Sequence, residues 1–160
     1  MTNYKGVYII IDGDAGERVV TTNVDGQYKY QKSKSKYPAY HFRLSSRDLA
    51  LFGQLYLNKG VWNDTPIVPK EWIAVSTKPY SIYTQDKKRY SYGMFWRLKL
   101  AENSEEVESF YHTDKSIQLL GVYSDTKMVI IHRVNTEKTY KYDKADLDKT
   151  LQLVFDSKIA

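Results

Sequence analysis

Between residues 90 and 100, apolar side chains recur at every second position, and three further apolar stretches follow up to residue 134, separated by short intervals of loop and turn residues. Alternation with a period of two is typical of strands that bury one face, and the short intervals favour hairpins. The pattern predicts the strands Tyr90–Leu100, Glu108–Thr113, Ile117–Tyr123 and Met128–Val134. They should form an antiparallel meander, so any fold for this chain needs a second layer that covers the apolar face of that sheet.

A capped helical pattern lies ahead of these strands. In Ser45-Ser46-Arg47-Asp48, a serine hydroxyl can accept from the backbone amide three residues on while Asp48 reaches back, which is a capping box. With Asn58-Lys59-Gly60 as the end signal, it predicts a helix at about 46–58. The apolar residues that recur at helical spacing and should face the core are Leu49, Leu51, Phe52, Leu55 and Tyr56.

A second, short helix should follow. Pro69 stands where a helix tolerates proline best, at its first position, and the helix should run to about Thr77 and bury Trp72 and Ile73. The segment 61–68 ahead of it predicts two short extended pieces around an Asn-Asp turn.

The two ends of the chain differ in regularity. Tyr4–Ile11 and Arg18–Val24 favour extended backbone around a turn cluster, which predicts a leading hairpin. Asp25–Pro38 has almost no aliphatic residue and is predicted to be a loop. At the other end, the range 143–157 predicts a terminal helix that covers one sheet face through Leu147, Leu151, Val154 and Phe155.

Together these elements predict an α/β (α+β) fold with an antiparallel sheet, a C-terminal packing helix and a small helical insert from Ser45 to Thr77. A chain of 160 residues with 42% apolar residues suits a single domain over residues 1–160. The longest apolar run, Val7–Ile11, stops at Asp12 and is too short for a membrane span or a secretory signal. The default expectation is a cytoplasmic location.

Positive charge is concentrated in one segment of a chain whose net charge is +5. From Gln27 to Arg43 no acid occurs, and the bases alternate with aromatic rings, which suits anionic ligands. The candidate anion-binding residues are Lys29, Lys32, Lys34, Lys36 and Arg43. Because lysines in loops are usually only solvated, we do not expect nucleic-acid binding, and an anionic polymer is the alternative ligand. The cluster Lys87–Arg89 is balanced by downstream glutamates and is predicted to be a solvated loop.

No metal or cofactor is expected. His41, His112 and His132 are far apart in the sequence, and the chain has no cysteine. It also lacks the glycine-rich phosphate-binding motifs, so nucleotide hydrolysis has no support.

One ordered series of motifs is specific over a long stretch. It begins at Tyr37-Pro38-Ala39-Tyr40, passes through the capped helix and Ile67-Val68-Pro69-Lys70-Glu71-Trp72, and ends in Tyr92-Gly93-Met94-Phe95-Trp96, Tyr111-His112-Thr113-Asp114, Gln118-Leu119-Leu120-Gly121 and Val129-Ile130-Ile131-His132-Arg133-Val134-Asn135. This series resembles the part of the serine β-lactamase and penicillin-binding protein superfamily that follows its active-site tyrosine motif. The nearest branch is the class C β-lactamase-related hydrolases. The resemblance spans about residues 25–135 and implies the C-terminal half of a β-lactamase/transpeptidase-like fold.

The resemblance also implies a chemistry. In that family a serine, activated by a lysine one helical turn away, attacks an amide or ester carbonyl, and the tyrosine of a Tyr-x-Asn motif relays protons. His112-Thr113-Asp114 matches the third element, a strand that lines the site, so His112 and Thr113 are the candidate catalytic residues. The other two elements should lie upstream of Met1. Asp114 replaces the family's glycine and adds a negative charge where substrate carboxylates bind, which argues against turnover.

Chance matches to the missing elements carry little weight. Ser33-Lys34-Ser35-Lys36 fits Ser-x-x-Lys by letter but has no apolar stripe to hold it on a helix. Ser124-Asp125-Thr126-Lys127 fits too, yet it is expected to be a turn between strands. Tyr56-Leu57-Asn58 fits Tyr-x-Asn, but it ends the capped helix, where core packing is the better account of Tyr56.

The resemblance therefore implies acyl transfer on β-lactam, ester or D-amino peptide substrates, with this chain inactive alone. An upstream half of the same fold, or self-association through uncovered apolar surface, would be the partner. The competing interpretation is a non-catalytic module that binds a protein partner or an anionic polymer through residues 28–43. Salt separates the two, because binding of lysines to a polyanion weakens steeply as ionic strength rises.

Overall fold

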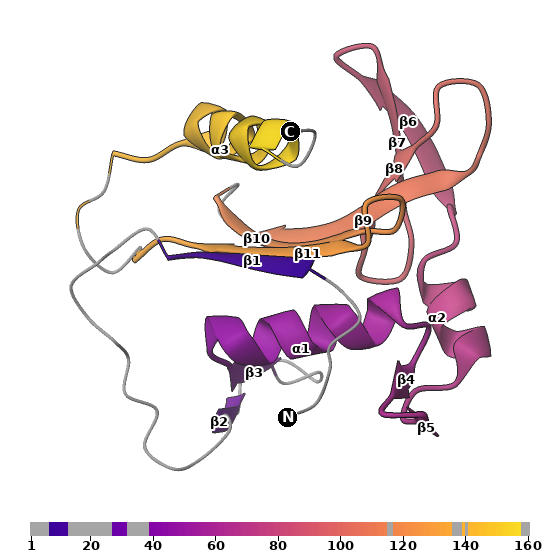
Figure 1. Cartoon of the computed structure of the whole chain (residues 1–160), viewed down its shortest axis with the longest axis vertical. Coiled ribbons are helices and arrows are strands. Elements are labelled where there is room, and N and C mark those ends of the chain that lie inside the picture. Colours follow the sequence, from indigo (N-terminus) through magenta and orange to yellow (C-terminus); the bar gives the residue numbers. More distant parts are fainter. Residues whose placement is uncertain are drawn as a thin grey trace.

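The computed structural model describes residues 7–12, 27–31, 39–114, 117–135, 139 and 141–157, with side chains from residue 44 onward. This part of the chain forms an α+β fold around a seven-stranded sheet with the strand order β1-β11-β10-β9-β8-β7-β6. Helix α1 (Ser46–Leu57) lies under one face of the sheet and helix α3 (Lys144–Ser157) lies over the other (Figure 1). The expected class, an antiparallel sheet with a C-terminal packing helix, is confirmed.

The rear strands form the antiparallel meander that the alternation predicts. They are β8 (Arg97–Leu100), β9 (Val107–Asp114), β10 (Gln118–Tyr123) and β11 (Met128–Arg133), each paired with the next. The front strand β1 (Val7–Asp12) lies beside β11 and runs parallel to it. The second strand of the expected leading hairpin, Arg18–Val24, lies outside the described residues.

The prediction of one long strand over Tyr90–Leu100 is wrong. Strand β7 (Lys88–Tyr92) ends at a turn in which the Gly93 N–H donates to the Trp96 carbonyl at 2.9 Å. The Met94 N–H donates to the Ser76 carbonyl at 2.9 Å. A Cβ on Gly93 would lie 2.3 Å from that same carbonyl oxygen, so this close approach requires glycine. The chain therefore folds back at this point instead of continuing.

A hairpin also stands ahead of this turn, at a place where a charged loop was expected. Strand β6 (Ser81–Gln85) pairs antiparallel with β7, and Asp86 and Lys87 form the turn between them, with φ angles of 50° and 61°. Left-handed φ at both turn residues matches the twist of tight hairpins. Lys88 and Arg89 consequently belong to a strand, and only Lys87 of the predicted loop lies in a turn.

Helix α1 has the predicted caps but buries a different set of side chains. The Ser45 hydroxyl accepts from the Asp48 N–H at 3.2 Å, and the Asp48 carboxylate accepts from the Ser45 N–H at 3.0 Å. The buried positions are Ala50, Gly53, Gln54 and Tyr56. Leu51 and Phe52, which were expected to face the core, are 36% and 38% exposed. The helix lies so close to β11 that a Cβ on Gly53 would be 2.5 Å from Val129 Cγ1, so small residues make the contact.

The next segment follows the prediction except at one tryptophan. Strands β4 (Val61–Trp62) and β5 (Thr65–Pro66) flank the expected Asn-Asp turn, and helix α2 (Lys70–Ser76) begins directly after Pro69. Ile73 is buried, as expected, but Trp72 is 50% exposed. A helix this short buries one narrow face, and here that face carries Ile73 and Ser76, which lie next to the turn after β7.

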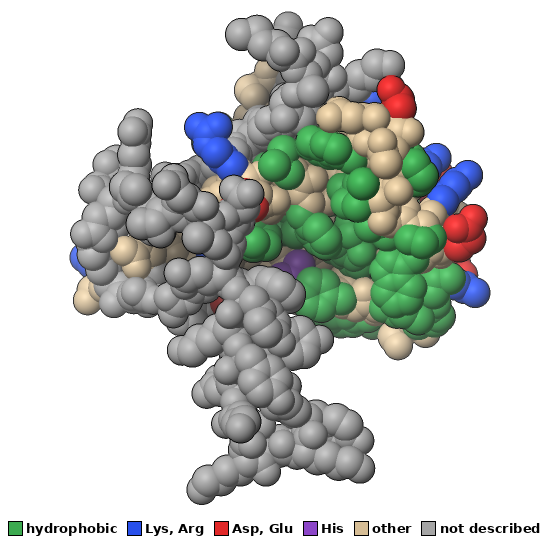
Figure 2. Space-filling view, turned by 90° about the horizontal axis from the view of Figure 1, so that it is seen from below, with side chains coloured by type: hydrophobic (Ala, Val, Ile, Leu, Met, Phe, Trp, Pro, Cys, Tyr) green, Lys and Arg blue, Asp and Glu red, His purple; other side chains and the backbone are tan. Residues whose placement is uncertain are grey.

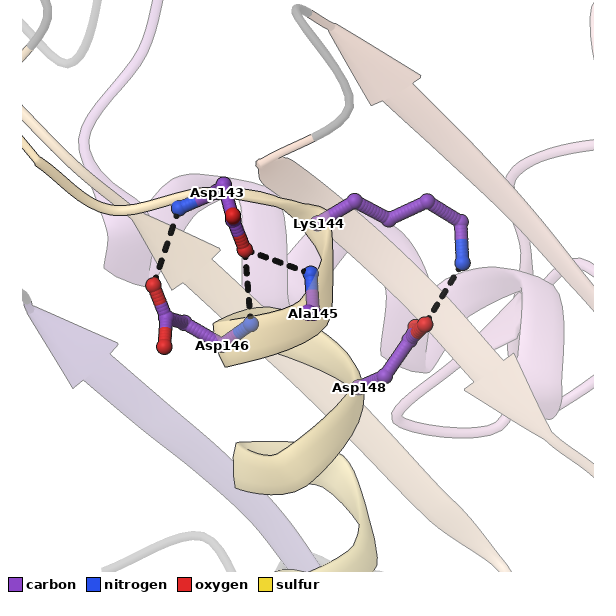
Figure 3. A network of polar contacts seen from close by, with 5 residues as sticks. All are labelled: Asp143, Lys144, Ala145, Asp146 and Asp148. Carbon is purple, nitrogen blue, oxygen red and sulfur yellow. Dashed lines mark hydrogen bonds and ion pairs between the residues drawn. The ribbon is translucent and has the colours of Figure 1, made fainter.

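The terminal helix is confirmed. The Asp143 carboxylate accepts from the N–H groups of Ala145 and Asp146, and Lys144 forms an ion pair with Asp148 (Figure 3). Leu147 is buried, and the rest of the predicted stripe packs against the same cluster: Leu151, Val154 and Phe155. None of the described helices combines the length and apolar composition that crossing a membrane requires.

The prediction of a loop over Asp25–Pro38 is wrong for part of that range. Strand β2 (Gln27–Gln31) pairs antiparallel with β3 (Ala39–Arg43). Tyrosine favours strands, and two of the residues in β2 are tyrosines, a signal that outweighs the lysine content. The rest of the basic segment, Lys32–Pro38, lies outside the described residues.

Two apolar clusters fill the space on the two faces of the sheet. The first, called the cluster under α1, lies between α1 and the sheet and includes Trp96, Leu98, Phe110, Val129 and Ile131. The cluster under α3 contains Leu119, Met128, Ile130 and Leu147. Successive residues of one strand enter different clusters, because side chains of a pleated strand point alternately to the two faces of the sheet. The strand register therefore shows on which face, the α1 side or the α3 side, each side chain of a neighbouring strand lies.

Candidate functional site

The segment His112-Thr113-Asp114 forms the end of β9, and one backbone edge of it is open. On one side these residues pair with β10, with His112 opposite Leu120 and Asp114 opposite Gln118. On the other side the pairing with β8 ends at Tyr111, because β8 starts at Arg97. No other described strand pairs with residues 112–114 on that side. The backbone groups that point to this side therefore have no strand partner among the described residues, and an extended ligand can pair with them.

The two candidate catalytic residues lie on opposite faces of the sheet. His112 alternates with Tyr111, and its partner Leu120 belongs to the cluster under α1. Thr113 lies opposite Leu119, which belongs to the cluster under α3. A ligand on the α1 side would thus meet the imidazole of His112 but not the hydroxyl of Thr113. The exposed Asp114 lies on the same face as His112, two residues further along the strand.

The ring of Phe95 covers His112. The two ring centroids are 4.4 Å apart with planes 7° from parallel, and Phe95 itself is 71% exposed. Phe95 has a φ of 76°, in the left-handed region that a bulky side chain rarely adopts. Strain of this kind is common at functional sites and costs of order 1–3 kcal/mol. The turn that carries Phe95 is held by the hydrogen bond from Met94 to Ser76 of α2.

Phe95 and His112 are the outer members of a larger aromatic cluster on the α1 side. Trp96 contacts Phe95, Tyr56 and Phe110 with ring centroids 6.2, 4.9 and 5.0 Å apart. Phe52 of α1 extends the cluster to the surface, with its ring centroid 6.3 Å from that of Trp96. Seen from the α1 side, hydrophobic side chains gather into a broad exposed area (Figure 2). A half-buried imidazole therefore lies next to an open strand edge and exposed aromatic rings.

The remaining predicted site residues are not brought to this place by the described structure. Lys29 lies opposite His41 and Arg43 lies opposite Gln27 on the β2–β3 ribbon, where only the backbone is described. The segment Lys32–Lys36, which includes the Ser33-Lys34-Ser35-Lys36 match, lies outside the described residues. Among the residues that the structure describes, no group of three or more His, Asp or Glu side chains comes together as metal ligands.

Two letter matches have the structural roles that were expected. The Lys127 N–H donates to the Ser124 carbonyl at 3.2 Å, which closes the turn between β10 and β11. Tyr56 is 8% exposed within the aromatic cluster, and Asn58 is the C-cap of α1, with its amide oxygen accepting from Gln54. Neither arrangement places a serine or tyrosine hydroxyl beside a lysine ammonium.

Sequence reasoning missed Phe95 as a site residue. It placed Phe95 on the second face of a continuous strand, whereas the turn rotates the ring over His112. Gly93 was the available signal, because an isolated glycine inside an alternating strand pattern often marks a bulge, a bend or a close backbone approach.

Comparison with known proteins leaves the assignment of a family open. No protein-family model matches the chain, and no curated protein matches it. The resemblance to β-lactamase-related serine hydrolases stays a prediction that rests on the motifs themselves.

Proposed function

We propose that this chain supplies the sheet side of the substrate site of a β-lactamase-related serine hydrolase, and that the nucleophilic serine and its lysine come from an N-terminal half of the same fold. The observation that carries the proposal is the open edge of residues 112–114 next to the stacked pair Phe95 and His112. An acyl compound with a peptide-like backbone would extend the sheet at this edge. The ring of Phe95 would contact its side chain.

The roles of the residues follow from that arrangement. Backbone groups of residues 112–114 would align the scissile amide or ester, since strand pairing fixes both position and direction of an extended substrate. His112 would contact the substrate on the α1 face, where Phe95 shields one face of the imidazole. Asp114 would repel substrates with a carboxylate at the neighbouring position, which favours neutral acyl compounds and esters over β-lactams.

The first test uses the gene in its natural context. Translation of the DNA ahead of the Met1 codon should reveal an in-frame Ser-x-x-Lys followed by Tyr-x-Asn. The complete protein should then hydrolyse p-nitrophenyl acetate and react covalently with a fluorescent fluorophosphonate, whereas the 160-residue chain alone should do neither. A complete protein without such motifs, or one that carries them but is not labelled, overturns the proposal.

Substitutions in the complete protein test the two residues of this chain. His112→Ala should lower kcat/KM for the ester about 10- to 100-fold, in the range typical for a positioned polar group. Ser124→Ala, in the turn between β10 and β11, is the matched control and should keep full activity. Equal kinetics for His112→Ala and Ser124→Ala would remove His112 from the site.

The substitution Phe95→Gly compares the effect of the strained backbone on stability with the effect of the ring on substrate binding. Phe95→Gly removes the ring but suits the left-handed φ, so the free energy of unfolding should stay level or rise by about 1 kcal/mol. The same variant should raise KM for aromatic esters in the complete protein. A variant that loses stability while its KM is unchanged shows that Phe95 is only a packing residue.

The second candidate function is a non-catalytic module for an anionic polymer. The observation that favours it is the β2–β3 ribbon, which places Lys29 and Arg43 two register positions apart. The double substitution Lys29→Gln, Arg43→Gln should weaken binding to heparin, and the affinity of the unchanged chain should fall steeply between 50 and 200 mM salt, roughly tenfold or more. Binding that does not respond to salt or to the double substitution excludes this function.

A further inference from the structure

The face of the sheet that carries α3 has a second cluster of polar aromatic residues, beyond the end of the helix layer. Arg97 lies on β8, opposite Tyr111 of β9 and Tyr92 of β7. Tyr83 of β6 lies opposite Tyr90 of β7. Since Tyr111 packs against the cluster under α3 and Leu98 belongs to the cluster under α1, Arg97 and these tyrosines share the α3 face. This site is on the other face from His112 and does not depend on the proposed function.

The guanidinium of Arg97 is held in place by two tyrosine rings. Its Nε–H donates to the Tyr83 hydroxyl at 2.8 Å, and its Cζ lies 5.9 Å from the Tyr83 ring centroid and 5.7 Å from that of Tyr92. Those rings are themselves 6.0 Å apart, with planes 22° from parallel. Because these two ring faces pack against one another, they are not free to stack on an aromatic ligand. The groups that remain for a ligand are hydrogen-bond donors.

The donors of this cluster lack acceptors among the described residues. Arg97 uses only Nε, which leaves the four N–H groups of its two terminal nitrogens. The Tyr83 oxygen accepts from Arg97, and its own O–H has no acceptor in the described part of the chain. Side chains this poor in partners and only partly exposed are usually satisfied by water or by a ligand.

Two neighbouring cations on these strands have oxygen acceptors for their terminal nitrogens, which the described residues do not supply to Arg97. Lys99, two residues further on the same face of β8, forms an ion pair with Glu108 at 2.5 Å. One terminal nitrogen of Arg89 on β7 donates to the carbonyls of Ala101 and Ser104. Of these three, Arg97 is the one whose guanidinium interacts only with tyrosine side chains among the described residues, and Tyr92, on the edge of the cluster, is 48% exposed.

The hydroxyl of Tyr111 stays protonated at physiological pH. Burial raises the pKa of Tyr111 to about 12, with Arg97 acting in the opposite direction. The guanidinium stays protonated: burial lowers the pKa of Arg97, but the hydrogen bond with Tyr83 and the nearby hydroxyls of Tyr111, Tyr83 and Tyr92 together raise it above its already high ordinary value. An anion that entered this cluster would therefore meet one full positive charge and neutral O–H donors, with no carboxylate of the described residues in the way.

We propose that Arg97 and the hydroxyl of Tyr83 form a binding site for an oxyanion, the carboxylate or phosphoryl group of a small ligand. The terminal guanidinium nitrogen on the Nε side and the Tyr83 hydroxyl, which accepts from Nε, lie next to each other and can donate together to one oxyanion, and the full positive charge suits both groups. The aromatic rings hold the guanidinium at a fixed position, which lowers the entropy lost on binding.

The test is a titration of the ¹⁵N-labelled chain with sodium acetate and, in a separate arm, sodium phosphate, against sodium chloride at the same ionic strength. The Nε–Hε resonance of Arg97 and the amide resonances of Tyr83 and Tyr92 should shift along a saturating curve with one or both oxyanions. Saturation with acetate alone identifies a carboxylate site, and saturation with phosphate alone identifies a phosphoryl site. Shifts that are linear in concentration, or equal to those in chloride, show an adventitious ion only and overturn the proposal.

Three variants assign the effect to these residues. Arg97→Gln should abolish the saturating shift of the Tyr92 amide, and Arg97→Lys, which keeps the charge but loses the fork, should weaken binding by about 5- to 20-fold. Arg89→Gln is the matched control and should bind like the unchanged chain. If Arg97→Gln does not fold, Arg97→Lys decides alone, and unweakened binding in that variant also overturns the proposal.

Discussion

The two ends of the seven-stranded sheet are covered in different ways. At β10 and β11 both faces carry a helix, and the residues Val122, Val129, Ile130 and Ile131 are 0% exposed. At β6 and β7 the described residues are less covered, with Ile82 44% exposed and Tyr92 48% exposed. Both candidate sites, the open edge of residues 112–114 and the Arg97 cluster, lie at the border where the double cover ends. A sheet that is packed on both faces provides rigidity, and access for a ligand begins only where one layer stops.

The largest effect should come from a cavity in the covered end. Ile131→Ala should lower the free energy of unfolding by about 2–5 kcal/mol, because the cluster under α1 collapses only in part around the missing atoms. Ile82→Ala on the uncovered end should cost less than about 1 kcal/mol, since its side chain is already half in water. Urea unfolding of both variants measures the difference. Equal losses would mean that the two ends are equally packed.

Overpacking in the covered end should have the next largest effect. Gly53→Ala favours a helix by about 1 kcal/mol, yet its Cβ would lie 2.5 Å from Val129 Cγ1, so we expect a net loss of about 1–2 kcal/mol. The double variant Gly53→Ala, Val129→Ala should lose less than the sum of the single variants. Additive losses in a double-mutant cycle would contradict a direct contact between α1 and β11 at this point.

Alkaline pH should weaken the α3 side of the sheet by a smaller amount. Burial holds the pKa of Tyr111 at about 12, above its value of about 10 in the unfolded chain, and also raises the pKa of Tyr123. The unfolded state therefore loses its protons first, so the stabilisation is complete below pH 10 and is lost as pH rises from about 10 to 12. Tyr111→Phe should flatten the fall of stability with pH over that range. An unchanged slope would contradict the buried position of Tyr111.

The smallest effects on stability should come from the start of α3, where a helix cap and a surface ion pair can be compared. Asp143→Ala removes the acceptor for the N–H groups of Ala145 and Asp146 and should cost about 1 kcal/mol. Asp148→Asn removes the ion pair with Lys144, where both side chains are more than half exposed, and should cost about 0.5 kcal/mol or less. Thermal unfolding in low and high salt checks the ranking. A larger loss for Asp148→Asn would reverse it.

Much of this architecture could be predicted from local pattern. The caps of α1, the strands β9 to β11 and the stripe of α3 depend on period and on capping chemistry, which operate within a few residues. The isolated Gly93 was the one local signal of the break between β7 and β8, but the break itself depends on the approach of Gly93 to the Ser76 carbonyl of another element. The exposed positions of Phe52 and Trp72 have the same origin, since the partner surface decides which part of an apolar stripe is buried.

The same contrast between local sequence pattern and tertiary packing holds for the two candidate sites. His112 and Thr113 were identified by motif, but the motif contained no information on faces, and the strand pleat places the two on opposite sides of the sheet. The Arg97 cluster was not predicted at all, because its members come from four strands and the break between β7 and β8 brings Tyr92 back opposite Arg97.

Residue order alone therefore set most of the elements, their caps and the helix-on-sheet character of this α+β chain, since hydrogen bonds within a turn and apolar periodicity act locally. Packing between distant elements decided the rest: where β8 begins, which edge of β9 stays open, and which rings reach the surface. These outcomes depend on the shape of a neighbouring surface, which exists only after the chain has folded.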